Sequence, residues 1–219
     1  MDKKLKILIV EDERKVDSFI KKEIEESRTK SGALLVKALR ETDNKVKAVI
    51  SSSAIGWYGP DTPTSIDKGF NEDWNSSSDF LGHTCKLWEA SIQPVEKLDK
   101  RLVILRTGIV LSNDGGALLE FKKPLKFGIA GVLGGGDQIT SWVHIEDICR
   151  MYVYAMENEI SGIFNAVAPQ PVTNKELTLA LAKSLRGRSF IPVHVPSFIL
   201  KIMLGEMSVE VLKSVNISV

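Results

Sequence analysis

Three consecutive serines, Ser51, Ser52 and Ser53, are the first residues in the chain whose position points to chemistry. They follow an apolar run at 46–50, which predicts a buried strand, and they precede a glycine-rich loop at 54–60. Open α/β sheets bind ligands at the carboxyl ends of their strands, where a serine hydroxyl can hydrogen-bond a carbonyl or hydroxyl group. Serines are also common in turns, so the cluster by itself leaves a catalytic role and a turn-forming role open.

Further segments follow these serines in a definite order. RTGIVL stands at 106–111, GGGDQ at 134–138 and WVHIED at 142–147. Together with SSSAIGWYG at 51–59, DFLGHTCKLWE at 79–89, GGAL at 115–118, FNAVAPQPVTN at 164–174 and LGE at 204–206, the series resembles the extended short-chain dehydrogenase/reductase superfamily, in its nucleoside-sugar-epimerase-like branch. The resemblance runs from about residue 24 to residue 219.

This resemblance implies an epimerase/dehydratase-like oxidoreductase that uses NADP or NAD. Its partner would be a small-molecule substrate, such as a nucleotide sugar or another carbonyl or hydroxyl compound. Ser53 matches the catalytic serine; the cofactor-binding positions are Ser51, Ser52, Thr107, Gly108, Ile109 and Val110, and the substrate positions are Tyr58, Gln138, Trp142 and His144. By residue type alone, Trp142 fits a core position and His144 a loop hydrogen bond equally well. No metal-ligand pattern is predicted.

Two departures from the superfamily bear on activity. The superfamily pairs a Tyr with a Lys four residues later on one helix face, so that the lysine lowers the pKa of the phenol. Here that spacing falls on Leu81 and Cys85, while Lys86 lies about 100° of helix away from the expected face. Neither Leu81 nor a buried Cys85 can replace the pair.

The second departure concerns the phosphate-binding turn. The superfamily opens with a Gly-x-x-Gly-x-x-Gly turn whose free backbone amides seat the cofactor pyrophosphate. Here Glu11, Asp12 and Glu13 follow the first apolar run, and the first glycine of the chain is Gly32. Because carboxylates repel a pyrophosphate, we expect weak or absent NAD(P)H binding.

The first 26 residues resemble the opening strand and helix of response-regulator receiver domains. In that family Glu11 and Asp12 would help to bind Mg²⁺ beside a phospho-accepting aspartate on a later strand. The next strand here ends in serines, so we expect Glu11 and Asp12 to be structural caps. The predicted organisation is a receiver-like segment at 1–26, a partial Rossmann-like core at 27–168 and a partial C-terminal substrate-side region at 169–219, shortened relative to the family.

The periodicity predicts the elements that must position these residues. Strands at about 5–10, 46–52, 101–106 and 162–167 should form one mainly parallel sheet with helices on both faces. Helical spacing covers 14–42, as one helix or as two joined at Ser31-Gly32, and 80–98, bent near Pro94. Residues 60–78 have loop composition, 147–157 are predicted as a helix, and Thr173 with Glu176 forms a capping box.

Composition narrows the remaining possibilities. The 219 residues carry 29 Lys and Arg against 28 Asp and Glu, a net charge of +1, which argues against nucleic acid or a membrane surface as the main partner. Two isolated cysteines and no secretory segment predict a cytoplasmic protein. Three hypotheses stay open: an NAD(P)-dependent oxidoreductase or epimerase, a non-catalytic fold relic or binding protein, and a Mg²⁺-binding phosphorelay fragment. Substrate and oligomeric state are left open.

Overall fold

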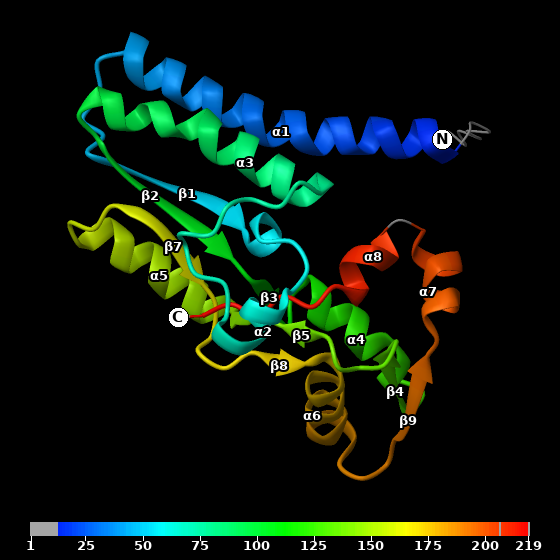
Figure 1. Cartoon of the computed structure of the whole chain (residues 1–219). Helices are drawn as coiled ribbons and strands as arrows, with labels where there is room; N and C mark the ends of the chain where they lie inside the picture. Colours follow the sequence, from blue (N-terminus) through cyan, green and yellow to red (C-terminus); the bar gives the residue numbers. More distant parts are fainter. Residues whose placement is uncertain (1–12, 206, 219) are drawn as a thin grey trace, which may run out of the picture.

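The computed structural model describes residues 13–205 and 207–218. The predicted strand at 5–10 and the predicted caps Glu11 and Asp12 lie outside the described residues. Figure 1 shows a sheet between two helical layers, joined to a second group of short strands and helices.

The central sheet has three parallel strands in the order β1-β2-β7. Their bounds are β1 Ala48–Ala54, β2 Arg101–Thr107 and β7 Gly162–Ala166, which confirms the three predicted strands within the described residues. In register, Ala54 lies beside Thr107 and Thr107 beside Ala166, so the three strands end together at one edge.

One face of this sheet is covered by α1 (Glu13–Glu41) and α3 (Phe80–Ile92) (Figure 1). α1 is one uninterrupted helix. Gly32 allows it to approach α3 closely, because a Cβ there would lie 2.2 Å from the Ser91 hydroxyl oxygen. The sequence predicts one helix over 80–98 that bends near Pro94, whereas α3 ends at Ile92 and the chain continues through Pro94 as the 3₁₀ helix η2 (Gln93–Leu98). The core of this layer consists of Val36, Val49, Ile92, Val95, Leu102 and Ile104.

The opposite face is covered by α5 (Ile145–Glu157). The core of this second layer consists of Val103, Leu105, Val143, Ile148, Ala155 and Ala166. Since neighbouring residues of β2 alternate between the two cores, Leu102 and Ile104 face α3 whereas Val103 and Leu105 face α5. Helices on both faces of a parallel sheet confirm the predicted Rossmann-like α/β class.

Short strands and helices form the remainder of the fold. β3 (Ile109–Leu111) pairs with β6 (Trp142–His144), β4 (Ile129–Leu133) with β9 (Ile191–Val195), and β5 (Ile139–Thr140) with β8 (Val172–Thr173). The helices are α4 (Ala117–Leu125), α6 (Asn174–Arg186), α7 (Ser197–Leu204) and α8 (Met207–Leu212). The predicted capping box of Thr173 and Glu176 is confirmed at the start of α6.

The segment at 60–78 corrects the sequence prediction of a loop. It contains a short helix, α2 (Pro63–Lys68), which Thr62 caps by accepting the backbone N–H of Ser65. The helix forms because a proline suits its first position and the side chain of Ser65 in turn accepts the N–H of Thr62. A 3₁₀ turn, η1 (Ile55–Trp57), joins β1 to this segment.

No helix in the described ranges is both long enough and apolar enough to cross a membrane.

Candidate active site

The carboxyl edge of the sheet brings together the serines of β1 and the segment that follows β2. Ser53 lies beside Arg106 in the register of the two strands. Because side chains alternate along a strand, Ser53 and Arg106 both face α3, as Val49 and Ile104 do. Ser52 and Thr107 therefore face the α5 side.

A buried ion pair stands at the centre of this edge. The Arg106 guanidinium donates from Nε to Glu89 Oε1 at 2.9 Å and from Nη2 to Glu89 Oε2 at 3.0 Å. Arg106 is only 1% exposed and Glu89 6%. This bidentate geometry allows an arginine and a carboxylate to be buried together, since each charge satisfies the other.

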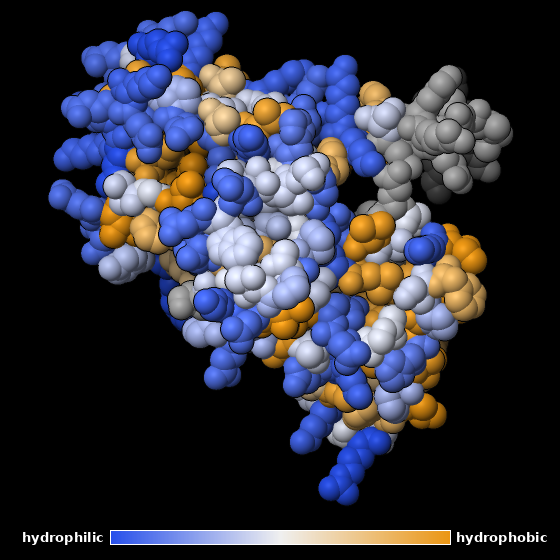
Figure 2. All heavy atoms as spheres, in the orientation of Figure 1, coloured by the Kyte–Doolittle hydropathy of each residue, from blue (hydrophilic) through white to orange (hydrophobic). Residues whose placement is uncertain are grey.

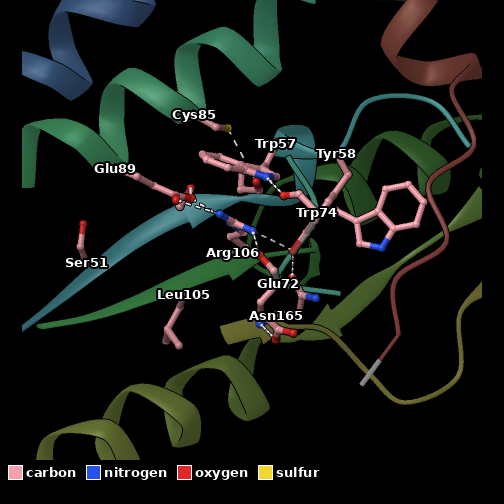
Figure 3. A network of polar contacts seen from close by, with 12 residues as sticks. Ser51, Trp57, Tyr58, Glu72, Trp74, Cys85, Glu89, Leu105, Arg106 and Asn165 are labelled. Carbon is pink, nitrogen blue, oxygen red and sulfur yellow. Dashed lines mark hydrogen bonds and ion pairs between the residues drawn. The ribbon is translucent and has the colours of Figure 1, made fainter. Parts of the chain in front are cut away.

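The same guanidinium holds the segment that covers the edge (Figure 3). Arg106 Nη1 donates to the Tyr58 hydroxyl oxygen at 3.0 Å and to the Glu72 carbonyl oxygen at 3.0 Å. Its planar face lies 3.8 Å from the centroid of the Trp57 ring. One side chain therefore ties η1, Tyr58 and the chain near Glu72 to the end of β2.

Asn165 connects this network to the third strand. The Tyr58 hydroxyl donates to Asn165 Oδ1 at 2.7 Å, and the Asn165 backbone N–H donates to Glu72 Oε1 at 2.7 Å. Burial raises the pKa of Tyr58 above its ordinary value, although the bond from Arg106 opposes this shift. Tyr58 is thus a neutral hydrogen-bonding group at the wall of the site.

The Ser53 hydroxyl belongs to this network. It donates to Glu89 Oε1 at 2.7 Å, and the residue is 2% exposed. Ser51 and Ser52 are half-buried on the same strand, with hydroxyls directed to backbone carbonyls of Ser52 and Ser53. The catalytic role of Ser53 stays a prediction, and it requires the hydroxyl to leave Glu89.

Leu81 and Cys85, at the positions of the superfamily's Tyr and Lys, make structural contacts instead. Leu81 lies against Gly56 of η1, where a Cβ on the glycine would be 3.1 Å from Leu81 Cβ. The buried Cys85 thiol donates to the Ala54 carbonyl oxygen at 3.6 Å, and burial raises its pKa to about 11. Cys85 is therefore a protonated thiol at neutral pH, and Lys86 is exposed.

The predicted cofactor segment, Thr107 to Val110, crosses from β2 into β3. The Gly108 N–H donates to the Ala166 carbonyl at 3.1 Å and the Ile109 N–H to the Ser141 carbonyl at 2.9 Å. A Cβ on Gly108 would lie 2.7 Å from Val167 Cγ1, so only glycine fits this crossing. Thr107 is half-buried and donates to the Leu105 carbonyl at 3.3 Å.

Ser52 and Thr107 carry half-buried hydroxyls at the strand ends. They would be polar partners for the nicotinamide end of a dinucleotide. The backbone amides of Gly108 and Ile109 already have partners, and the one orphaned buried side-chain atom within the described ranges, Thr178 Oγ1, lies in α6. The part of the chain that the structure describes contains no Gly-x-x-Gly-x-x-Gly turn between a strand and a helix that could bind the pyrophosphate.

The predicted substrate residues just before β5 and on β6 have structural contacts. Gln138 Nε2 donates to the Leu133 carbonyl at 3.0 Å, and Trp142 Nε1 donates to the Gln170 carbonyl at 3.2 Å. His144 Nδ1 accepts the Glu146 N–H and so caps α5. Trp142 lies beside Ile109 in the β3–β6 pair, which joins these residues to the cofactor segment but not to the Arg106 network.

Sequence reasoning missed Glu89, Glu72 and Asn165 as parts of the site. A usable signal was Arg106 itself, since an arginine that follows four buried apolar residues of a central strand needs a buried acid nearby. Among the described residues no group of His, Cys, Asp and Glu could hold a metal ion.

Comparison with known proteins defines the class. The chain superposes on human epimerase family protein SDR39U1 (isoform 2), solved with NADPH, with a TM-score of 0.81 and 29% identity, covering 91% of this chain and 66% of that one. The fold is thus that of the NAD(P)-dependent epimerases within the short-chain dehydrogenase/reductase superfamily. No family model matches the sequence.

Sequence relatives define the family more closely. The chain is 38% identical over 195 residues to epimerase family protein YfhF of Bacillus subtilis, covering 88% of this chain and 62% of that protein. It is 34% identical over 204 residues to mouse SDR39U1, covering 91% of this chain and 67% of that protein. The chain belongs to this epimerase protein family, and it spans about 62% to 67% of the length of these relatives.

Proposed function

We propose that this chain is an NAD(P)-dependent oxidoreductase of the epimerase type, acting on a hydroxyl or carbonyl group of a small molecule such as a nucleotide sugar. The observation that carries the proposal is the carboxyl edge of the sheet, where Ser53 and Thr107 lie on neighbouring strand ends fixed by the Arg106–Glu89 pair. The family relation supports it, because the human relative was solved with NADPH.

NADP or NAD, when bound, supplies the hydride acceptor and donor for a reversible oxidation. We assign the nicotinamide end to Ser51, Ser52 and the segment from Thr107 to Val110. Tyr58, Gln138, Trp142 and His144 are assigned to the substrate side. With Leu81 and Cys85 in the place of the acid-base pair, Ser53 is the hydroxyl that we assign to the reacting oxygen of the substrate.

Cofactor binding is the first test. NADPH and NADH are titrated into the chain while nicotinamide fluorescence and thermal unfolding are followed; a ligand at 100 times its Kd stabilises a fold by about 2.7 kcal/mol. Because no glycine turn is present, we expect binding that is weaker than in relatives carrying that turn but still saturable. A Gly108→Val variant, with a side chain forced against Val167, should bind less. Absence of any saturable signal would favour the binding-protein or relic hypothesis.

Turnover is the second test. Nucleotide sugars are supplied with NAD or NADP, and Ser53→Ala is compared with Ser161→Ala, an exposed serine just before β7 at the other end of the sheet. Ser53→Ala should lower kcat by about a hundredfold or more, whereas Ser161→Ala should not. Equal rates for the two variants would remove Ser53 from the mechanism. The cytoplasmic location stays a prediction.

A further inference from the structure

Two helix ends and two turns meet at the end of the molecule farthest from α1 (Figure 1). The C-terminal turns of α4 and α6 lie together, since Arg186 Nη2 donates to the Lys126 carbonyl at 3.4 Å. The turns that follow them also meet, because the Ile191 N–H donates to the Gly128 carbonyl at 2.8 Å. We call this end, formed by residues 119–129 and 183–191, the distal tip.

The distal tip carries a strong local excess of positive charge. Its cations are Lys122, Lys123, Lys126, Lys183, Arg186 and Arg188, and its single acid is Glu120. Glu120 pairs with Lys123 at 2.6 Å. Within the described ranges, no ion pair joins an acid to any of the other five cations.

Large apolar side chains project between these cations. Phe127 is 82% exposed and Ile191 is 69% exposed, and Leu185 is also exposed. A shallow cleft of about 240 Å³ also lies at this end, and it is lined by Lys122, Leu125, Lys126, Leu185 and Arg186. In Figure 2 hydrophobic and hydrophilic atoms lie side by side at this end of the molecule.

Helix stability explains only part of this pattern. Cations in the last turn of a helix interact favourably with its dipole, which accounts for Lys122, Lys123, Lys183 and Arg186. Arg188 lies beyond the end of α6 and gains less from that effect. The dipole also gives no reason to expose Phe127 and Ile191, whose burial would be favourable.

We propose that the distal tip binds an anionic lipid surface. Clusters of four to eight Lys and Arg attract acidic headgroups, and exposed aromatic and aliphatic side chains among them can enter the boundary between headgroups and acyl chains. A duplex nucleic acid would use the cations but offers no apolar layer to Phe127, Leu185 and Ile191. A stable interface with an acidic protein needs a broad complementary surface, whereas the cleft at this end is shallow.

The proposal differs from what the whole-chain charge predicts. A net charge of +1 gives no reason to expect a membrane partner, yet one end of the fold carries five cations that form no ion pair with a described residue. The attraction to acidic lipid headgroups comes from the distal tip alone. The carboxyl edge of the sheet is left free by the proposal, so it stands or falls independently of the proposed activity.

Vesicle sedimentation tests the proposal. The full chain is mixed with phosphatidylcholine vesicles with and without phosphatidylserine, at low and high salt. We expect sedimentation only with phosphatidylserine and at low salt. The double variant Lys126→Glu/Arg186→Glu should bind at least about tenfold more weakly, and Phe127→Ser several-fold more weakly.

Matched controls keep the result interpretable. The double variant Lys37→Glu/Arg40→Glu makes the same charge change on the exposed surface of α1, and should bind like the unaltered chain. Unchanged thermal midpoints establish that each variant is folded. No phosphatidylserine-dependent sedimentation, or an equal loss in both charge variants, would overturn the proposal. So would tight binding of a labelled oligonucleotide that Phe127→Ser leaves unchanged while vesicles fail to bind.

Discussion

The carboxyl edge of the sheet and the distal tip differ in where their charged side chains lie: they are buried at the edge and exposed at the tip. At the edge, Arg106 is 1% exposed, and its donors contact Glu89, Tyr58 and the Glu72 carbonyl. At the tip, Lys126, Arg186 and Arg188 are exposed without an ion pair among the described residues. A buried charge must be satisfied inside the fold, whereas an exposed one can be satisfied from outside.

This contrast separates two kinds of functional signal. The network at the edge holds three strand ends and the covering segment in one geometry, which is what a site for a small molecule requires. The tip has no such fixed geometry, and its signal is an excess of charge and apolar area on the surface.

The largest effect is expected from Glu89→Ala. Removing one partner of a buried pair leaves the Arg106 charge without compensation, so the variant should lose about 3–5 kcal/mol of the free energy of unfolding. Urea denaturation followed by tryptophan fluorescence measures this loss. Arg106→Met combined with Glu89→Leu should cost less than the sum of the two single changes, since the charges are removed together. Additive costs would mean that the pair is not coupled.

A smaller but specific difference is expected between the two cysteines. The pKa of Cys85 is raised to about 11 by burial, whereas Cys149 is exposed on α5. A shift of two pKa units from an ordinary thiol lowers the thiolate fraction about a hundredfold. Titration with a thiol reagent should therefore modify one cysteine rapidly in the folded chain and two after denaturation. Rapid modification of both would show that the edge is open to solvent.

Lys213 provides a test with a pH signature. Its Nζ donates to Asp79 Oδ2 at 2.9 Å, lies 2.7 Å from Glu210 Oε2, and connects the C-terminal segment to the start of α3. Lys213→Met should cost about 1–2 kcal/mol at neutral pH, because charged hydrogen bonds are lost.

The direction of the pH effect follows from both partners. Burial opposes the charge of Asp79, but the hydrogen bonds from the Gly82 N–H and from Lys213 outweigh it and hold the pKa of Asp79 below its usual range. The stability that Asp79 contributes is therefore present above about pH 4 and is lost as the pH falls through the pKa of the folded state. Burial opposes the charge of Lys213, but Glu210 and Asp79 raise its pKa. The stability that charged Lys213 contributes therefore persists up to about pH 10. The difference between Lys213→Met and the unaltered chain should be constant from about pH 5 to 9 and shrink in acid. A constant difference down to pH 2 would exclude Asp79 as the partner.

The smallest effect is expected at the tip. Lys126→Ala removes an exposed cation without an ion pair among the described residues, so the free energy of unfolding should change by no more than about 0.5 kcal/mol. Thermal unfolding of Lys126→Ala and of Glu89→Ala under the same conditions measures the difference between the two regions. A loss comparable to that of Glu89→Ala would mean that the tip is a structural element.

Much of the fold was predictable because its signals are local. The apolar run before Ser51, the spacing of apolar residues through α1, and the Thr173–Glu176 capping box each indicate an element within a few residues of sequence. α2 was missed because its six residues look like loop composition, and its stabilising contacts include the reciprocal bonds of Thr62 and Ser65 and the distant Asn216 amide.

The site was predictable only in part, because its contacts are distant in sequence. Ser53 and Glu89 are 36 residues apart, and Tyr58 and Asn165 are 107 residues apart. The resemblance placed Ser53 and Thr107 at the strand ends but gave no partner for either. That Ser53 is held by a buried carboxylate could be learned only from the packing of α3 on the sheet.

Hydrogen exchange with and without NADPH tests the central claim most directly, because it reports on both regions at once. We predict slower exchange at 51–54 and 107–111 when NADPH is present, and no change at 119–129 and 183–191. Protection confined to the distal tip, or no protection anywhere at saturating cofactor, would contradict the assignment of the cofactor to the carboxyl edge of the sheet.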